Sequence, residues 1–272
     1  TSTRATSGSA RTICWRPTSS AAGRLVRAFS GTRTVTLTEH SIGPIAGVDS
    51  RKRQPAIVGI KFKMPRVTVS VGARIHAGFC NLSLARERLY RGVGLGLEQP
   101  RVTLSAEPAD DVHAPSGIFE NYARRTCEIL DLPGATIDVE ERLPRHVGLG
   151  SGTQTALSIY TAIAKSHDQR PTPREHAPAL GRGGRSGVGV ATFERGGFVL
   201  DAGQPSERFT DAVPQRGDWQ VPPVSVRHEL PDRWRIVLAI PDADPGLEGE
   251  TEERSMRSAV REGESALAAE IA

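Results

Sequence analysis

Three glycines within five residues stand at Gly148, Gly150 and Gly152, inside the segment PRHVGLGSGTQ of residues 144–154. Glycine lets the backbone bend tightly and approach a ligand without a side chain in the way. The segment leads from a strand-like stretch into a helix-like one, so unpaired N–H groups and the positive dipole end of that helix point at the loop. A phosphate fits such a place, although the spacing is neither that of a P-loop nor that of the dinucleotide fingerprint. A plain glycine-rich turn before a helix with a Ser or Thr cap stays open as the alternative.

A second glycine-rich loop, GRGGRSGVG at residues 181–189, carries Arg182, Arg185 and Ser186 among five glycines. Arginine suits bidentate recognition of phosphate or carboxylate. The two loops together therefore predict a substrate with two anionic groups, unless the second loop is only a solvated surface turn.

Three further residues could carry chemistry. Arg74 and His76 are two residues apart, on one face at the end of an expected strand. His76 could be a general acid or base or a phosphate donor, or a hydrogen-bonded structural histidine. Asp201 ends another expected strand and could hold a metal or a ribose hydroxyl, or be an ordinary turn carboxylate.

The elements that must position these residues alternate irregularly between strand and helix patterns. Period-two alternation predicts strands over residues 67–75, 92–97, 101–106, 136–141 and 235–240, and a hairpin of 189–193 with 197–201. Helical spacing predicts helices over 118–132, 153–166, 171–180 and 252–272, the first capped by Ser116, and the polar stretch 203–223 reads as a linker. Hairpins mixed with helices favour an α+β fold over a doubly wound parallel sheet.

Charge divides the chain at residue 64. Residues 1–63 hold 11 Lys and Arg against 2 Asp and Glu, whereas residues 64–272 hold 24 against 29. Strand alternation begins directly after Met64, so we expect residues 1–63 to be a non-native or disordered basic leader translated upstream of a start at Met64. A transit peptide or a nucleic-acid-binding arm would have the same composition. The leader holds only Trp15, Phe29 and Phe62 as aromatic residues of the kind that would interleave with its basic ones, so we expect no nucleic-acid partner.

The remaining composition predicts a cytoplasmic protein. No run approaches the roughly 18 apolar residues of a membrane span. The three cysteines, Cys14, Cys80 and Cys127, form neither a disulfide framework nor a metal-ligand spacing.

Residues 144–153 resemble the second motif of the GHMP kinase superfamily, the glycine-rich loop that receives ATP phosphates in those kinases. This chain resembles one branch of that superfamily more closely than the kinases. ARIHAGF at 73–79 with YRGVGLGLE at 90–98, GLGSGTQ at 148–154, and GRGGRSG at 181–187 with FERGGF at 193–198 occur here in order. Together they resemble the β-ribofuranosylaminobenzene 5′-phosphate synthase family.

The resemblance implies a fold of two domains. Residues 64–222 would form an N-terminal domain like domain 2 of ribosomal protein S5, carrying the phosphate loop. Residues 223–272 would begin a ferredoxin-like C-terminal domain, incomplete here because the superfamily's third glycine motif is absent. The family also suggests a homodimer for the full-length protein.

The activity that the resemblance implies is the joining of 4-aminobenzoate or 4-hydroxybenzoate to phosphoribosyl pyrophosphate, with Mg2+, in tetrahydromethanopterin biosynthesis. CO2 and pyrophosphate would be released. The implied phosphate ligands are Gly148, Gly150, Ser151, Gly152, Thr153 and Gln154, with Ser151 and Asp201 for the metal. Arg182, Arg185 and Ser186 would bind the second anionic group, and Arg74 and His76 would contact the benzoate or handle protons.

One departure separates this chain from the kinases. They commonly place an aspartate two residues after a Ser-Gly pair to activate the acceptor hydroxyl, but here Ser186-Gly187 is followed by Gly189 at that position. Phosphoryl transfer would lack its usual base. A small-molecule kinase using ATP and an inactive fragment remain the alternatives.

Overall fold

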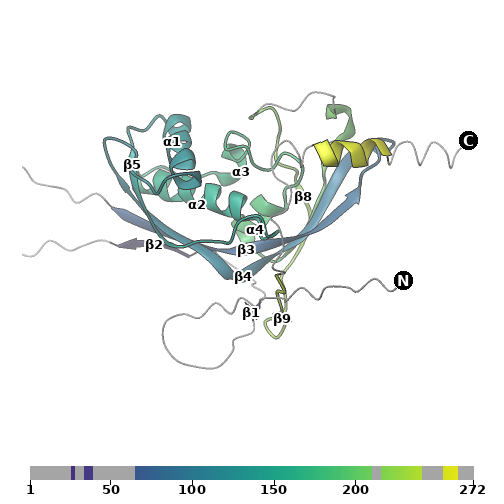
Figure 1. Cartoon of the computed structure of the whole chain (residues 1–272), viewed down its shortest axis with the longest axis horizontal. Coiled ribbons are helices and arrows are strands. Elements are labelled where there is room, and N and C mark those ends of the chain that lie inside the picture. Colours follow the sequence, from purple (N-terminus) through teal and green to yellow (C-terminus); the bar gives the residue numbers. More distant parts are fainter. Residues whose placement is uncertain (1–25, 28–33, 39–64, 210–215, 241–253, 263–272) are drawn as a thin grey trace, which may run out of the picture.

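The computed structural model describes residues 26–27, 34–38, 65–209, 216–240 and 254–262, and every structural statement below concerns these residues. A long antiparallel hairpin of β3 (Arg66–Asn81) and β4 (Arg88–Pro108) forms the centre of the sheet (Figure 1). Alternate residues of both strands are buried, for example Val69 opposite Leu104 and Val71 opposite Val102. The apolar alternation thus turns one face of the hairpin towards the core.

The strands predicted at 92–97 and 101–106 are one continuous strand. β4 runs through Gln99–Pro100, whose peptide bond is cis. β3 likewise extends beyond the predicted 67–75. A proline normally interrupts a strand pattern, which is why the sequence divided β4 in two.

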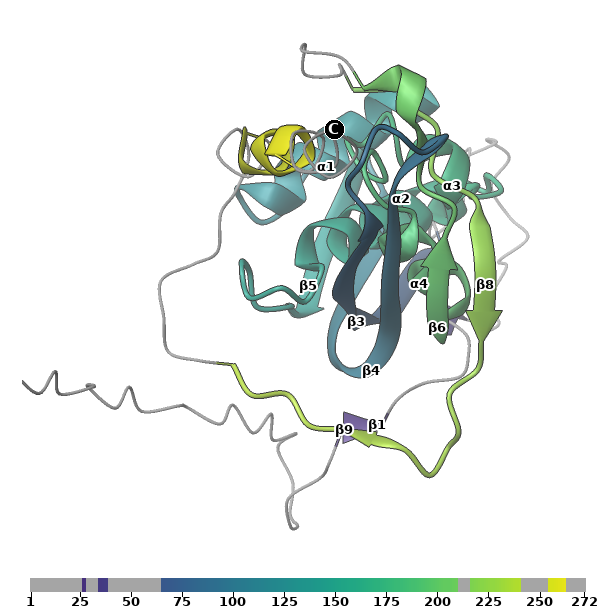
Figure 2. The ribbon, with the colours of Figure 1, turned by 90° about the vertical axis from the view of Figure 1, so that its right-hand side faces the viewer.

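The other strands pair antiparallel around this hairpin. The distal part of β4 pairs with β5 (Ala135–Glu141), and its proximal part pairs with β6 (Phe198–Asp201) and β7 (Gln204–Pro205). β8 (Val224–His228) lies beyond β6, and Figure 2 shows β3, β4, β6 and β8 side by side. β2 (Thr34–Thr38) pairs with β3, and β1 (Val26–Arg27) pairs with β9 (Arg235–Ile236) in a separate two-stranded sheet.

The helices lie on one face of the sheet (Figure 1). They are α1 (Ile118–Leu130), α2 (Ser151–Ser166), α3 (Pro173–His176) and α4 (Val188–Arg195), with a short 3-10 turn, η1 (Ser206–Arg208). α2 is central: 12 of its 16 residues are buried, as expected for a helix that packs on all sides. Residues 254–262 are also helical.

The antiparallel sheet with helices on one face confirms the predicted α+β class, but several local predictions were wrong. The helix predicted over 171–180 is only α3, and the linker predicted over 203–223 contains β7 and η1. Residues 189–193, predicted as a hairpin strand, belong to α4, whose buried face (Val190 and Phe193) packs into the core. The residue that caps α1 is Gly117 and not Ser116. Only the first two residues of the predicted strand 235–240 are extended and paired.

The predicted domain boundaries stay predictions. Of the expected leader, residues 1–63, the structure describes only β1 and β2, and the rest lies outside the described residues. Of the helix predicted over 252–272, residues 254–262 are described and helical. In the described part of the chain, none of the helices combines the length and apolar character needed to cross a bilayer.

Candidate functional site

The first glycine loop ends in the uncapped N-terminus of α2. Gly148 and Gly150 adopt positive φ angles of 79° and 67°, which glycine reaches without strain. Gly150 occupies the cap position, no side chain bonds to the cap, and the first turn of α2 holds no acidic residue. The buried Leu149 anchors the loop, and its carbonyl accepts a 3.1 Å hydrogen bond from the Arg74 N–H. The positive end of α2 is therefore left without a negative side chain to neutralise it.

Two arginines lie directly against this loop. A methyl group on Gly150 would stand 2.7 Å from Cγ of Arg74, and one on Gly152 would stand 2.9 Å from a terminal nitrogen of Arg182. Both contacts are closer than a real side chain tolerates, so glycine at these positions makes room for the arginines. The structure thus brings Arg74, from β3, and Arg182, from the second glycine loop, to the N-terminus of α2.

Arg182 is held in this position from α1. Its guanidinium lies 5.3 Å from the centre of the Tyr122 ring and donates to the Tyr122 hydroxyl. Its Nε atom is buried without a hydrogen-bond partner among the described residues. We predicted that Arg182 binds a second, separate anionic group, but its guanidinium lies at the first loop. The two glycine loops therefore face one common site.

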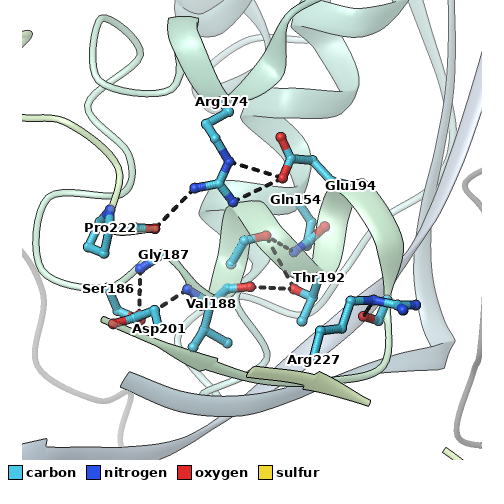
Figure 3. A network of polar contacts seen from close by, with 12 residues as sticks. Gln154, Arg174, Ser186, Gly187, Val188, Thr192, Glu194, Asp201, Pro222 and Arg227 are labelled. Carbon is cyan, nitrogen blue, oxygen red and sulfur yellow. Dashed lines mark hydrogen bonds and ion pairs between the residues drawn. The ribbon is translucent and has the colours of Figure 1, made fainter. Parts of the chain in front are cut away.

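Thr153 and Gln154 join α2 to α4. The amide of Gln154 donates 3.0 Å to the carbonyl of Gly189, and the side chain is 1% exposed (Figure 3). A methyl group on Gly189 would stand 3.1 Å from Cγ2 of Thr153. This placement gives Gln154 a packing role in place of the predicted phosphate contact. Ser151, the first residue of α2, remains partly exposed.

Asp201 is a buried residue whose carboxylate joins three segments of the chain. Its Oδ2 accepts from the Ser186 hydroxyl and the Gly187 N–H, both at 2.7 Å (Figure 3). Its Oδ1 accepts from the N–H groups of Gly92 and Gly203, at 2.9 and 2.8 Å. The residue is 0% exposed. A carboxylate accepts about four hydrogen bonds, so the metal role predicted for Asp201 requires one of these four to break.

The described residues contain no group of three or more His, Cys, Asp and Glu side chains arranged to hold one metal ion. Mg2+ does not require such a cage, because it is commonly bound through one or two protein groups together with phosphate oxygens and water.

His76 lies beside the Asp201 carboxylate. A methyl group on Gly92 would stand 2.2 Å from Oγ of Ser186 and 2.9 Å from Nε2 of His76, so these two polar atoms converge on one glycine. Burial lowers the pKa of His76 to about 4, and the charges of Arg74 and Arg185 also lower it, while Asp201 opposes them. His76 is therefore neutral at pH 7. Its Nε2 is buried without a hydrogen-bond partner among the described residues, so it is suited to hydrogen bonding more than to accepting a proton.

Sequence reasoning missed several residues that shape the site: Gly92, Tyr122, Gln204 and Trp219. Gly92 stood in a segment that carried the resemblance, yet nothing in its spacing revealed that Ser186 and His76 meet there. Tyr122 lies on a face of α1, Gln204 lies in the two-residue strand β7, and Trp219 lies in the expected linker. None of those positions carries a chemical pattern of its own.

Comparison with known proteins places the first loop in a recognised domain. Residues 117–197 match the model for the GHMP kinases N terminal domain. A β-ribofuranosylphenol 5′-phosphate synthase from Methanothermobacter thermautotrophicus is 36% identical over 199 residues, covering 68% of this chain and 60% of that protein. Proteins of the same name from Archaeoglobus fulgidus and Methanocaldococcus jannaschii are 37% and 28% identical, covering 66% and 65% of this chain and 58% and 60% of theirs. The chain thus spans about 60% of the length of these relatives.

Among solved structures, the mevalonate kinase of Methanococcus jannaschii matches with 11% identity and a TM-score of 0.39, covering 54% of this chain and 56% of that one. A likeness at that level carries no information about activity.

Proposed function

We propose that this chain carries the pyrophosphate-binding site of a synthase like the β-ribofuranosylphenol 5′-phosphate synthases that it resembles, built on the GHMP kinases N terminal domain that residues 117–197 match. The reaction would join 4-aminobenzoate or 4-hydroxybenzoate to phosphoribosyl pyrophosphate. The observation that supports this most is the uncapped N-terminus of α2, flanked by the guanidinium groups of Arg74 and Arg182.

Departure of pyrophosphate builds negative charge on the leaving oxygens. Fixed N–H dipoles and guanidinium groups stabilise such charge best when they are already in place before the reaction. Arg74 donates 3.4 Å to the carbonyl of Gly148, and Arg182 donates to the Tyr122 hydroxyl. We therefore assign the leaving pyrophosphate to Gly148, Gly150, Ser151, Gly152 and Thr153, together with these two arginines.

The remaining groups suit the other end of the substrates. Arg185 is close enough to His76 for its positive charge to lower the pKa of His76. A cationic guanidinium beside a neutral imidazole can bind a benzoate carboxylate or the 5′-phosphate without a proton transfer. We assign these two residues to that anionic group, and not Ser186, because its one hydroxyl proton is donated to Asp201.

Mg2+ fits this assignment as a companion of the pyrophosphate. It would neutralise the charge of the leaving pyrophosphate, with pyrophosphate oxygens and the Ser151 hydroxyl as its ligands. Asp201 is a poor ligand because its oxygens already accept four hydrogen bonds.

The reaction can be balanced without a general base. The bond between C1 of the ribose and the pyrophosphate oxygen breaks, and the oxygen keeps the electron pair. The ring carbon that bears the carboxylate bonds to C1, and CO2 then leaves, returning its bonding pair to the ring. No net proton is transferred, so a general base is not needed. Phosphorylation of an alcohol does need to remove a proton, and the position where kinases carry their aspartate is the buried Gly189.

The test is to incubate the protein with Mg2+, phosphoribosyl pyrophosphate and 4-aminobenzoate labelled in the carboxyl group, and to count released CO2. The same assay with 4-hydroxybenzoate identifies the accepted ring. Label release that requires phosphoribosyl pyrophosphate, and that falls strongly in Arg182→Ala, supports the proposal. No release, with ADP formed from ATP when candidate alcohols are added, would favour the kinase. If neither CO2 nor ADP is formed, an inactive fragment would be favoured.

A further inference from the structure

The segment from Trp219 to Pro222 lies over the second glycine loop at contact distance. A methyl group on Gly183 would stand 2.7 Å from a side-chain carbon of Val221, and one on Gly184 would stand 3.2 Å from the indole of Trp219. The loop that carries Arg182 is therefore covered by a segment that sequence patterns assign to a linker.

Two side chains fasten this segment. The amide of Gln204 donates to the carbonyls of both Gly184 and Gln220, at 2.7 and 2.8 Å, so it bridges the loop and the segment. At the other end, Arg174 donates 3.0 Å to the carbonyl of Pro222 while its guanidinium pairs with Glu194 of α4 (Figure 3). The segment is thus fixed to α4 and to the loop at once.

Trp219 also bonds to Arg182 itself. The indole Nε1–H donates 2.9 Å to the carbonyl of Arg182, while the N–H of Arg182 donates 2.8 Å to the carbonyl of Ala177. The backbone of Arg182 is held on both sides. The backbone position of Arg182 determines where its side chain starts. From there the guanidinium reaches the N-terminus of α2 at Gly152.

We propose that Trp219 is a positioning residue for Arg182, so that pyrophosphate binding at the N-terminus of α2 depends on Trp219 although its indole does not touch the ligand. The inference rests on the proposed function, because it takes the α2 N-terminus as the pyrophosphate site. A phenylalanine at position 219 keeps a ring against Gly184 but removes the only donor that reaches Arg182 from this side chain. Loss of that single hydrogen bond weakens the hold on Arg182 and leaves its charge unchanged.

The test measures binding of inorganic pyrophosphate in the presence of Mg2+ by titration calorimetry. Five proteins are compared: the wild type, Trp219→Phe, Arg182→Ala, the double variant, and Trp234→Phe as the matched control. Trp234 is 52% exposed. We expect about fivefold weaker binding for Trp219→Phe, the usual effect of one lost neutral hydrogen bond, and wild-type affinity for Trp234→Phe.

The double variant separates positioning from general destabilisation. If Trp219 acts through Arg182, then Trp219→Phe has no further effect once Arg182 is alanine. If Arg182→Ala fails to unfold cooperatively, Arg182→Gln takes its place in the cycle. Equal affinity of Trp219→Phe and the wild type would overturn the inference alone, as would a fivefold loss in both backgrounds. Absence of binding by the wild type would overturn the pyrophosphate site of the proposed function as well.

Discussion

Replacing Asp201 by asparagine tests whether this carboxylate is a structural hub or a metal ligand. Asparagine has nearly the same size and retains one oxygen, which can still accept from the N–H groups of Gly92 and Gly203. Its NH2 group takes the place of Oδ2. There it faces the Ser186 hydroxyl, which can rotate to accept a hydrogen bond, and the Gly187 N–H, which cannot.

The magnitude follows from these contacts. A hydrogen bond to a charged group contributes about 1.5–3 kcal/mol, and an unsatisfied buried donor costs about 1–3 kcal/mol. Asparagine is easier to bury than a carboxylate, which offsets part of this loss. We therefore expect Asp201→Asn to lower the free energy of unfolding by about 2–4 kcal/mol. Urea denaturation followed by circular dichroism measures this change.

A matched amide substitution provides the control. Glu120 forms an exposed ion pair with Arg124 one helical turn away, at 3.0 Å. Glu120→Gln should change the free energy of unfolding by no more than about 0.5 kcal/mol. The reasoning would be refuted if Asp201→Asn were as stable as this control and instead required much more Mg2+ for pyrophosphate binding, because that result would mark Asp201 as a metal ligand.

Three other substitutions test further contacts, two in the site and one at the buried Tyr160 of α2. Gly152→Ala places a methyl group 2.9 Å from Arg182 and displaces the guanidinium, so pyrophosphate affinity, measured by calorimetry, should fall about tenfold or more. Because the pKa of His76 is lowered to about 4, the unfolded chain takes up its proton first, and stability falls as the pH drops from about 6.5 towards 4. This loss is at most about 3 kcal/mol, and it should disappear in His76→Gln when urea denaturation is repeated across that pH range. Tyr160→Phe removes the hydroxyl that accepts the Thr172 N–H at 3.1 Å, and should lower the free energy of unfolding by about 1–2 kcal/mol in the same assay.

The local elements were largely predictable from sequence because their signals are local. Apolar spacing identified α1, α2 and β5 to within a few residues. α4 was mistaken for a strand because it is short and contains Val190, Thr192 and Phe193, residue types with high strand propensity. Its helical state comes from packing on α2 through Gly189, a tertiary contact that no short window contains.

The site was predictable in residue type and only partly in arrangement. Both glycine loops and Arg74, Arg182 and His76 were identified as candidates from their chemistry. The meeting of the two loops at Gly152 could not be seen, because it depends on how α1 and the segment after η1 hold Arg182. Asp201 was singled out for a metal or a ribose hydroxyl, and that role stays a prediction, because its four donors include Gly92, 109 positions away in the chain.

The glycines of this site serve two different purposes, and the distinction explains why a motif alone overstates the phosphate loop. Gly148 has a positive φ, and a methyl group there would meet no atom within 4 Å, so its role is conformational. Gly152 has no positive φ, but a methyl group there would stand 2.9 Å from a terminal nitrogen of Arg182, so the guanidinium would have to shift to admit it. Since the arginine and the glycine come from different loops, a substitution in either loop changes the same cationic surface.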